Sequence, residues 1–329
     1  MNKENYLKYE QSKSNTNEAT LSNTNLFGQT TSIVNKTLNH NLNDNDNLII
    51  INEKNNKKLE KSKNLYENNL ILEILTSWNL PEGYKLIIRN KKGLENSLIK
   101  RTLKEKEEKN IVYFGFQRED ELNSNPNIDY LLYPKEDFYD NKFIGKHFQI
   151  RYDTGNKQYY IKDLGFGFGT FIKLEEDIKL KDNFLINIGE TYIVFSLSQN
   201  ENDDSEKVSE NEEKENNSIN IKVFSGDENC DNYNFDCFSN PTILIGRNSF
   251  CDIIIEDKML SRVHCSAYFK ESEKDEERGW YLKDGNLEGK KSTNDTWFYC
   301  SEETKMEDNM IFKTNHNLFK CIIQKDGIK

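Results

Sequence analysis

The stretch TILIGRNSFCDIIIEDKMLSRVHCSAYF, residues 242–269, indicates both a fold and a function. Its apolar runs, rich in β-branched residues, alternate with polar turns, which is typical of short buried strands. Arg247 directly follows the first run, and Ser261 and Arg262 lie in a later turn. Guanidinium and hydroxyl donors that gather at one end of a sheet are suited to bind an anion such as a phosphate group.

Segments with the same strand pattern run from residue 84 to about 197 and again from residue 219 to the end. They are rich in β-branched and aromatic residues and are separated by turns that contain Asn, Asp or Gly. Short strands without long helical stretches between them favour a β-sandwich or a β-barrel. The sequence therefore predicts an all-β protein.

Composition predicts two β domains with less regular segments before and between them. Asn, Ser, Thr and Lys dominate the start of the chain, which we expect to be disordered. Leu and Ile at helical spacing ahead of Pro81 predict a short helix. An acidic stretch without aromatic residues predicts a disordered linker. The expected order is an extension at 1–65, a helical lead-in at 66–81, a β domain at 82–198, a linker at 199–218 and a β domain at 219–329.

The two β domains share an order of landmarks. Each begins with a Gly followed by an Arg, then has a strand that contains Asp and a turn that leads to His. An aromatic-x-Lys-Asp strand, a Gly- or Asn-rich turn that ends in Thr-aromatic, and two closing strands follow in both. This order indicates an internal duplication of a whole domain, because the period far exceeds that of solenoid repeats.

The 329-residue chain has a formal net charge of −11, and 35% of its residues are hydrophobic. Such a chain lacks the basic surface that nonspecific binding to nucleic acid or to an anionic membrane requires, so we expect neither as a partner. No apolar run is long enough to span a bilayer, and the first residues lack the apolar core of a secretory signal. We expect an intracellular protein, cytoplasmic or nuclear.

The groups that could carry chemistry form no catalytic or metal-binding pattern. The six cysteines include no Cys-x-x-Cys pair and the chain has four histidines, so we expect no metal site and no cofactor. Motifs of serine hydrolases, kinases and zinc proteases are missing. His264 precedes Cys265, but neighbouring residues on a strand point to opposite faces and cannot act as a base and its nucleophile. The sequence predicts that the protein is not an enzyme.

Residues 219–325 resemble the forkhead-associated (FHA) domain. The resemblance rests on Gly246-Arg247, on Ser261-Arg262-Val263-His264, on the strand that ends at Asp284, and on Ser292-Thr293-Asn294-Asp295-Thr296. Residues 82–198 match the same frame with weaker motifs. The resemblance implies two tandem β-sandwiches of a kind that binds phosphothreonine peptides through loops at one end, without catalysis.

The resemblance also implies roles for single residues. Arg247 would bind the phosphate through its guanidinium, Ser261 would donate its hydroxyl, and Arg262 would add charge and a backbone N–H. Thr293 and Asn294 would hold the main chain of the ligand, since an amide side chain can both donate and accept.

Two residues are expected to support the site rather than to bind. Gly246 provides the backbone geometry beside the arginine, and His264 joins two loops through hydrogen bonds. Two features depart from the family pattern. Asp295 stands where glycine is preferred and would place a carboxylate near the phosphate, offset by Lys290 and Lys291. The insert GNLEGKK, residues 285–291, lengthens the loop and would alter which peptides are selected.

The first domain departs further from the family pattern. Gly115 is separated from the next arginine, Arg118, by two residues. Ile144 and Gly145 stand in place of the Ser-Arg pair, His147 is kept, and Phe166-Gly167-Phe168 replaces Ser-Thr-Asn. We expect this domain to keep the sandwich and to have lost phosphate recognition.

Two functions are consistent with these features. The first is an adaptor in intracellular signalling that binds phosphothreonine-containing proteins through Arg247, Ser261 and Asn294. The alternative is a phosphorylation-independent scaffold that uses both sandwiches as interaction surfaces. The two can coexist if the first domain binds a constitutive protein partner while the second binds a phosphorylated one.

Overall fold

The computed structural model describes residues 69–77, 80–90, 92–99, 110–118, 127–132, 143–198, 218–226 and 230–324. The predicted extension at 1–65 and nearly all of the predicted linker at 199–218 lie outside the described residues. All the regular elements of the described part are β-strands, which confirms the predicted all-β class. No helix in this part is long and apolar enough to cross a membrane.

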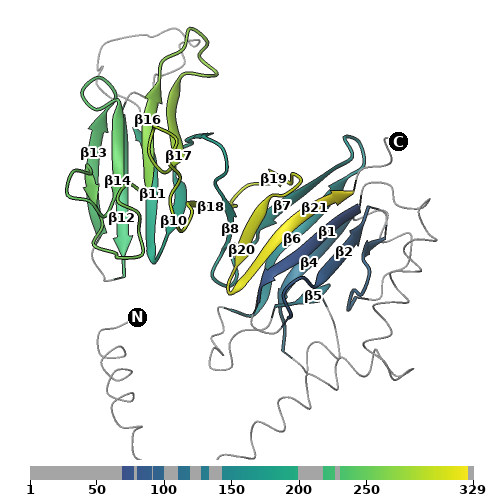
Figure 1. Ribbon diagram of the computed structural model, residues 1–329. Coiled ribbons are helices and arrows are strands. Elements are labelled where there is room, and N and C mark those ends of the chain that lie inside the picture. The colour runs from purple at the N-terminus through teal and green to yellow at the C-terminus, as the bar shows by residue number, and fades with distance from the viewer. Residues whose placement is uncertain are drawn as a thin grey trace, which may run out of the picture. The chain divides into compact units, whose positions relative to one another are not determined.

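The strands form two sandwiches, each with its own buried core (Figure 1). In the first sandwich, one layer is formed by six strands of a continuous 11-stranded sheet, which are β8 (Thr170–Lys173), β20 (Ile311–Thr314), β21 (Asn317–Gln324), β1 (Asn69–Thr76), β2 (Lys85–Arg89) and β3 (Gly93–Leu94). The facing sheet contains β19 (Thr304–Lys305), β7 (Gln158–Asp163), β6 (Gly145–Asp153), β4 (Ile111–Phe116) and β5 (Tyr130–Leu131).

The second sandwich has the same design. One layer is formed by the other five strands of the same 11-stranded sheet, which are β13 (Cys230–Asp236), β12 (Ser218–Ser225), β11 (Thr191–Ser198), β10 (Phe184–Ile188) and β18 (Trp297–Tyr299). The facing sheet contains β15 (Ile253–Ile254), β14 (Thr242–Gly246), β16 (Cys265–Lys270), β17 (Gly279–Asp284) and β9 (Ile178–Lys179).

The folded sandwiches do not coincide with the predicted domains 82–198 and 219–329. By sequence, strands β9 to β11 belong to the first copy. The apolar residues of this segment, from Leu174 just before β9 to Phe195 in β11, nevertheless pack in the second core. By sequence, strands β19 to β21 belong to the second copy. Buried residues of this segment, from Met306 to Cys321, nevertheless pack in the first core. The two copies have therefore exchanged their closing strands within one chain.

Strand pairing shows where the exchange takes place. β18 pairs with β10 in the second sandwich and also with β8 in the first, so the two copies cross at this pair of equivalent strands. β11 pairs with β12 antiparallel over its whole length, from Thr191↔Ser225 to Ser198↔Ser218. The corresponding place in the first sandwich is taken by the pairing of β1 with β21. Because the duplicated strands share one hydrophobic pattern, each closing segment fits either copy, and an exchange of equivalent elements costs little.

The helix predicted at 66–81 is wrong over Asn69–Thr76, which forms strand β1. Leu70, Leu72 and Ile74 alternate along the segment and are fully buried, whereas the residues between them are only partly buried. Alternation of this kind is the two-residue period of a strand. β1 lies between β2 and β21, and this sheet pairing overrides the helical spacing of the leucines.

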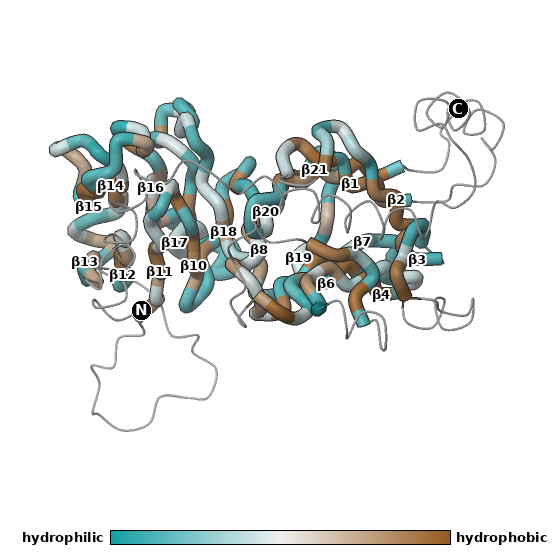
Figure 2. Tube along the Cα trace, turned by 90° about the horizontal axis from the view of Figure 1, so that it is seen from below, coloured by the Kyte–Doolittle hydropathy of each residue, from teal (hydrophilic) through white to brown (hydrophobic). Residues whose placement is uncertain are grey.

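The two cores differ in composition. In the first, Phe148 stacks on Phe114 with 4.5 Å between ring centroids and meets the edges of Phe312 and Phe319. The second core is mostly aliphatic, with Trp280 as its largest buried side chain. Figure 2 shows hydrophobic residues concentrated along the strands in both. Each sandwich thus offers a rigid support for the loops at its ends.

Candidate functional site

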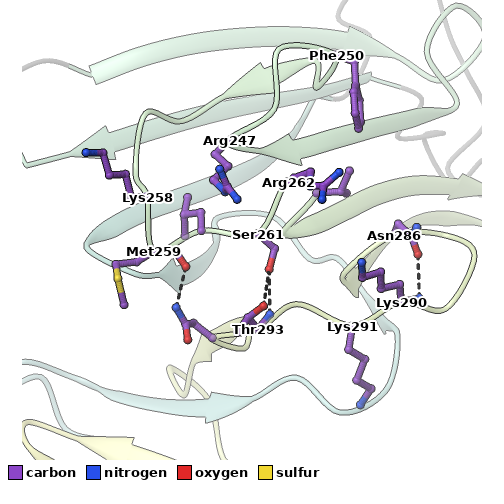
Figure 3. Close-up of a pocket in the computed structure, with 13 residues that line it drawn as sticks. Arg247, Phe250, Lys258, Met259, Ser261, Arg262, Asn286, Lys290, Lys291 and Thr293 are labelled. Carbon is purple, nitrogen blue, oxygen red and sulfur yellow. Dashed lines mark hydrogen bonds between the residues drawn. The ribbon is translucent and has the colours of Figure 1, made fainter.

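Loops at one end of the second sandwich enclose a cavity of about 590 Å³ (Figure 3). All five residues predicted to bind the ligand line it, which brings together Arg247, Ser261, Arg262, Thr293 and Asn294. The other lining residues are Phe250, Lys258, Met259, Leu260, Val263, Asn286, Lys290 and Lys291. The lining contains no carboxylate among the residues that the structure describes.

Gly246 places Arg247 at the edge of this cavity. It is the last residue of β14 and lies directly against the turn that carries Arg262. A Cβ atom at Gly246 would lie only 2.9 Å from the Arg262 carbonyl carbon and from the His264 backbone nitrogen. Two backbone bonds, from Arg247 N–H and Asn248 N–H to the Ser261 and Arg262 carbonyls, then hold the two turns together at 3.2 Å each. Glycine is therefore required by close approach of the two backbones.

Ser261 joins the turn before β16 to the turn before β18. Its Oγ accepts a hydrogen bond of 2.9 Å from the Thr293 N–H and lies 3.3 Å from the Thr293 hydroxyl. The two hydroxyls therefore lie together in the cavity, where a ligand oxygen can contact both. Arg247 extends beside them from the end of β14 (Figure 3).

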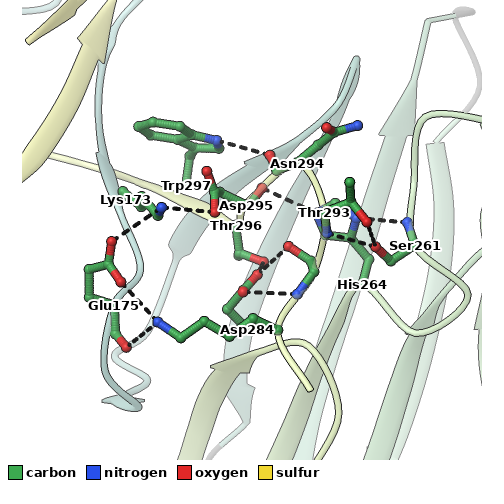
Figure 4. Close-up of polar contacts among 12 residues, drawn as sticks. Lys173, Glu175, Ser261, His264, Asp284, Thr293, Asn294, Asp295, Thr296 and Trp297 are labelled. Carbon is green, nitrogen blue, oxygen red and sulfur yellow. Dashed lines mark hydrogen bonds and ion pairs between the residues drawn. The ribbon is translucent and has the colours of Figure 1, made fainter. Parts of the chain in front are cut away.

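His264 is fully buried and joins the same two turns, the one before β16 and the one before β18, by hydrogen bonds. Its Nδ1 accepts from the Ser261 N–H at 3.2 Å, and its Nε2 donates to the Asp295 carbonyl at 3.1 Å (Figure 4). A backbone N–H only donates and a carbonyl only accepts, so these partners fix the neutral form with the proton on Nε2. Burial lowers the pKa of His264 and favours this form further.

Asn294 is held by the loop opposite. Its Nδ2 donates to the Met259 carbonyl at 2.7 Å, while the side chain remains exposed at the rim of the cavity. One Nδ2 hydrogen and the Oδ1 oxygen are left for a ligand, which suits contacts to a peptide main chain.

Asp284 braces the loop that carries Thr293 and Asn294. Its Oδ1 accepts from the Ser292 hydroxyl at 2.6 Å and from the Thr296 hydroxyl at 2.7 Å, and its Oδ2 accepts from the Ser292 N–H at 3.1 Å. Asp284 is buried, so each of these charge-assisted bonds is well shielded from water. The binding loop is therefore preformed, which lowers the cost of ordering it around a ligand.

The Asp295 carboxylate lies outside the cavity lining, contrary to the expectation that it would approach a bound phosphate. It forms an ion pair of 3.0 Å with Lys173 at the end of β8 (Figure 4). The backbone of Asp295 is left-handed, with φ of 57°, and the first copy has Gly169 with φ of 82° at the equivalent position. Asp is one of the residues that tolerate this conformation, so the departure from glycine is accommodated.

The insert at 285–291 forms a closed loop. The Asn286 N–H donates to the Lys290 carbonyl at 3.0 Å, and the Lys290 N–H donates to the Asn286 Oδ1 at 2.8 Å. Gly285 enters the loop with φ of 81° and lies against the Lys290 carbonyl, so no side chain fits there. The loop brings Lys290 and Lys291 into the cavity lining.

The corresponding end of the first sandwich is aromatic. Gly115 of β4 pairs with Leu131 of β5, just as Gly246 of β14 pairs with Ile254 of β15. Gly115 is therefore equivalent to Gly246. The residue that follows it, Phe116, stands in the place of Arg247, and Arg118 does not. Gly145 is covered by the ring of Phe166, whose Cδ1 would lie 2.5 Å from a Cβ atom added there.

Other aromatic residues complete this end. Phe166 and Phe168 are 46% and 48% exposed, and Phe143 lies 5.9 Å from Phe168 between ring centroids. His147 keeps a structural role, because its Nε2 donates to the Phe143 carbonyl at 2.6 Å.

Sequence reasoning missed part of the lining. Lys258, Met259 and Phe250 were not singled out, although they lie in the quoted stretch between the arginine and the serine. A signal was present, because a loop between two neighbouring strands must pass the same end of the sandwich as Arg247. No cluster of three or more metal-binding side chains occurs in the part of the chain that the structure describes.

The FHA domain family model matches the chain twice, over residues 125–189 and 243–311, so the chain carries two tandem FHA domains. Each matched segment contributes strands to both sandwiches. FHA domains bind phosphorylated peptides and are interaction domains rather than catalytic ones. The comparison with curated proteins found no match.

Proposed function

We propose that the protein is an adaptor that binds phosphothreonine-containing proteins through the cavity of the second sandwich. The observation that carries the proposal is the convergence of Arg247, Ser261 and Thr293 on one cavity without a carboxylate in its described lining. A phosphate dianion needs a guanidinium and short hydroxyl donors, and these residues supply both. Arg262 adds a second guanidinium, and one Nδ2 hydrogen and the Oδ1 oxygen of Asn294 remain for the peptide main chain.

Gly246 and His264 act in this proposal through the backbone. Gly246 allows the two turns to meet, and His264 sets their spacing by its bonds to Ser261 and Asp295. Neither touches the ligand. Binding of this kind needs no cofactor, no metal and no catalytic step. We also propose that the protein acts inside the cell, in the cytoplasm or nucleus, where kinases act.

A second candidate function concerns the first sandwich. Its equivalent end lacks the arginine and the hydroxyls, and Phe166 covers the position of Arg262. The loss of phosphate recognition that the sequence predicts is supported by this apolar surface. We propose that this end contributes to a phosphorylation-independent contact with a constitutive protein partner.

The test is selection from an oriented phosphothreonine peptide library with the full-length protein. Enrichment of a motif around phosphothreonine, lost when the library is dephosphorylated, is the expected result. The same peptides synthesised with phosphoserine measure the preference for the threonine methyl group. Equal retention of phosphorylated and dephosphorylated pools would reject the adaptor and favour the scaffold.

A further inference from the structure

The cavity carries more positive charge than one phosphate group requires. Its lining includes five cationic side chains, which are Arg247, Lys258, Arg262, Lys290 and Lys291. Among the described residues only Lys291 forms an ion pair, with Glu175 at 2.8 Å. The remaining four have no carboxylate within ion-pair distance in the described part of the chain, in a protein whose net charge is −11. Such a local excess of one sign favours an anionic ligand.

These cations lie on both sides of the hydroxyl pair. In the view of Figure 3, Arg247 and Lys258 lie on one side of Ser261, whereas Lys290 and Lys291 lie on the other. A cavity of about 590 Å³ has the size that holds an extended ligand rather than a single small ion. One phosphate group held by Arg247 and Ser261 therefore leaves Lys290 of the insert without an anionic partner, whereas Lys291 is paired with Glu175.

The insert is built to hold its lysines at the cavity. Lys291 donates to the Glu175 carbonyl at 3.1 Å as well as to its carboxylate, which anchors the insert to the segment after β8. Lys290 is fixed through its backbone by the two bonds to Asn286, and its side chain is exposed. The first copy has no counterpart, because the run from Asp163 to Thr170 is five residues shorter than the run from Asp284 to Thr296.

We propose that the second sandwich selects peptides that carry a second anionic side chain close to the phosphothreonine, and that Lys290 is the residue that recognises it. The proposal rests on the phosphopeptide function above and specifies its ligand. The shared chemistry is an anionic oxygen, supplied by Asp or Glu or by a second phosphate. Arg262, which neighbours Ser261 in the chain, would assist Lys290 when the second group is a phosphate.

The experiment uses the full-length protein and a peptide with one phosphothreonine as the baseline. A second anion, either Asp or a further phosphothreonine, is then placed at each position on both sides. We expect one region of the peptide to give a gain in affinity of about three- to tenfold, larger for phosphate than for Asp. Raising the salt to about 0.5 M should remove most of this gain, since exposed pairs are screened.

Variants assign the gain to the insert. Lys290→Gln should abolish the gain from the second anion, and Lys290→Glu should make the second anion unfavourable. Lys222→Gln is the control, because it removes the same charge from an exposed position on β12 outside the lining. Circular dichroism of each variant excludes unfolding.

The outcomes separate the two claims. Phosphate-dependent binding of the baseline peptide with no gain at any position, or with a gain that survives both Lys290 variants, would overturn this inference alone. Failure of the baseline peptide to bind would overturn the proposed function as well.

Discussion

Nζ of Lys291, from the second sequence copy, donates to both the backbone carbonyl and the carboxylate of Glu175, from the first, at 3.1 and 2.8 Å. A loop that lines the cavity is thus anchored on a segment contributed by the other copy. The contact exists because the closing strands of the two copies are exchanged. The site of the second sandwich therefore depends on residues 174–198 as well as on 218–298.

Engineered disulfides test the exchange directly. Glu73 and Lys320 are partners across β1 and β21, so Glu73→Cys with Lys320→Cys should oxidise readily, because cross-strand partners are within disulfide range. Val194 occupies in β11 the place of Lys320 in β21. Glu73→Cys with Val194→Cys is the matched control and should stay reduced, as judged by mass spectrometry. A disulfide in the control pair instead would mean that each copy keeps its own closing strands.

Core substitutions should affect the sandwich in which a residue is folded, not the copy from which it comes. Phe319 and Ile193 occupy equivalent positions and are both fully buried. Phe319→Ala should destabilise the first sandwich by about 3–5 kcal/mol and leave phosphopeptide affinity nearly unchanged. Ile193→Ala should destabilise the second sandwich and weaken binding when the temperature is raised. Thermal unfolding and titration of both variants provide the measurement, and the reverse pattern would contradict the exchange.

Acid should destabilise the protein through its two buried histidines. Burial lowers the pKa of His264 and of His147 below the ordinary value of 6.5. The unfolded chain then binds protons that the folded chain does not, so the free energy of unfolding should fall as the pH drops below about 6.5. Urea unfolding between pH 7.5 and 5 measures this slope. His147→Gln should reduce the slope, and an unchanged slope would show that this imidazole is protonated equally in both states.

Lys313 should produce a pH effect in the alkaline range. Burial lowers the pKa of its ammonium group to about 8. In the folded protein, Nζ of Lys313 donates to the Asn187 Oδ1 at 2.7 Å and lies 4.5 Å from the centre of the Trp297 ring. Between pH 8 and about 10.5 the unfolded chain holds a proton that the folded chain has released, so stability should rise with pH. Lys313→Met should lack this rise in urea unfolding. An identical profile for the variant would contradict the lowered pKa.

Much of the site was predictable because the decisive residues lie in short turns of one sequence copy. The order of Gly246, Arg247, Ser261 and His264 fixes the turn positions, and the alternating runs between them fix the strands. Asp295 was judged from its place in the chain alone, and its ion pair with Lys173 could not be seen without the pairing of β18 with β8.

The exchange itself left no trace in the sequence. Duplicated strands have the same period and similar apolar residues, so local pattern does not tell which copy a closing strand joins. The same limit explains β1, where leucines fit both a helix and a strand until β2 and β21 are placed beside them. The sequence comparison matched Arg118 to the position of Arg247, because the strand register was not known. The pairing of β4 with β5 places Phe116 at that position.

The central claim is that Arg247 binds a phosphate group on a partner peptide. The most direct measurement is a fluorescence-polarisation titration of the full-length protein with a selected phosphothreonine peptide, comparing wild type, Arg247→Ala and the exposed control Lys222→Ala. Loss of a charge-assisted pair of about 1.5–3 kcal/mol should weaken binding roughly ten- to a hundredfold in Arg247→Ala, with little change in the control. Equal affinities for the phosphorylated and unphosphorylated peptide, or full affinity in Arg247→Ala, would contradict the claim.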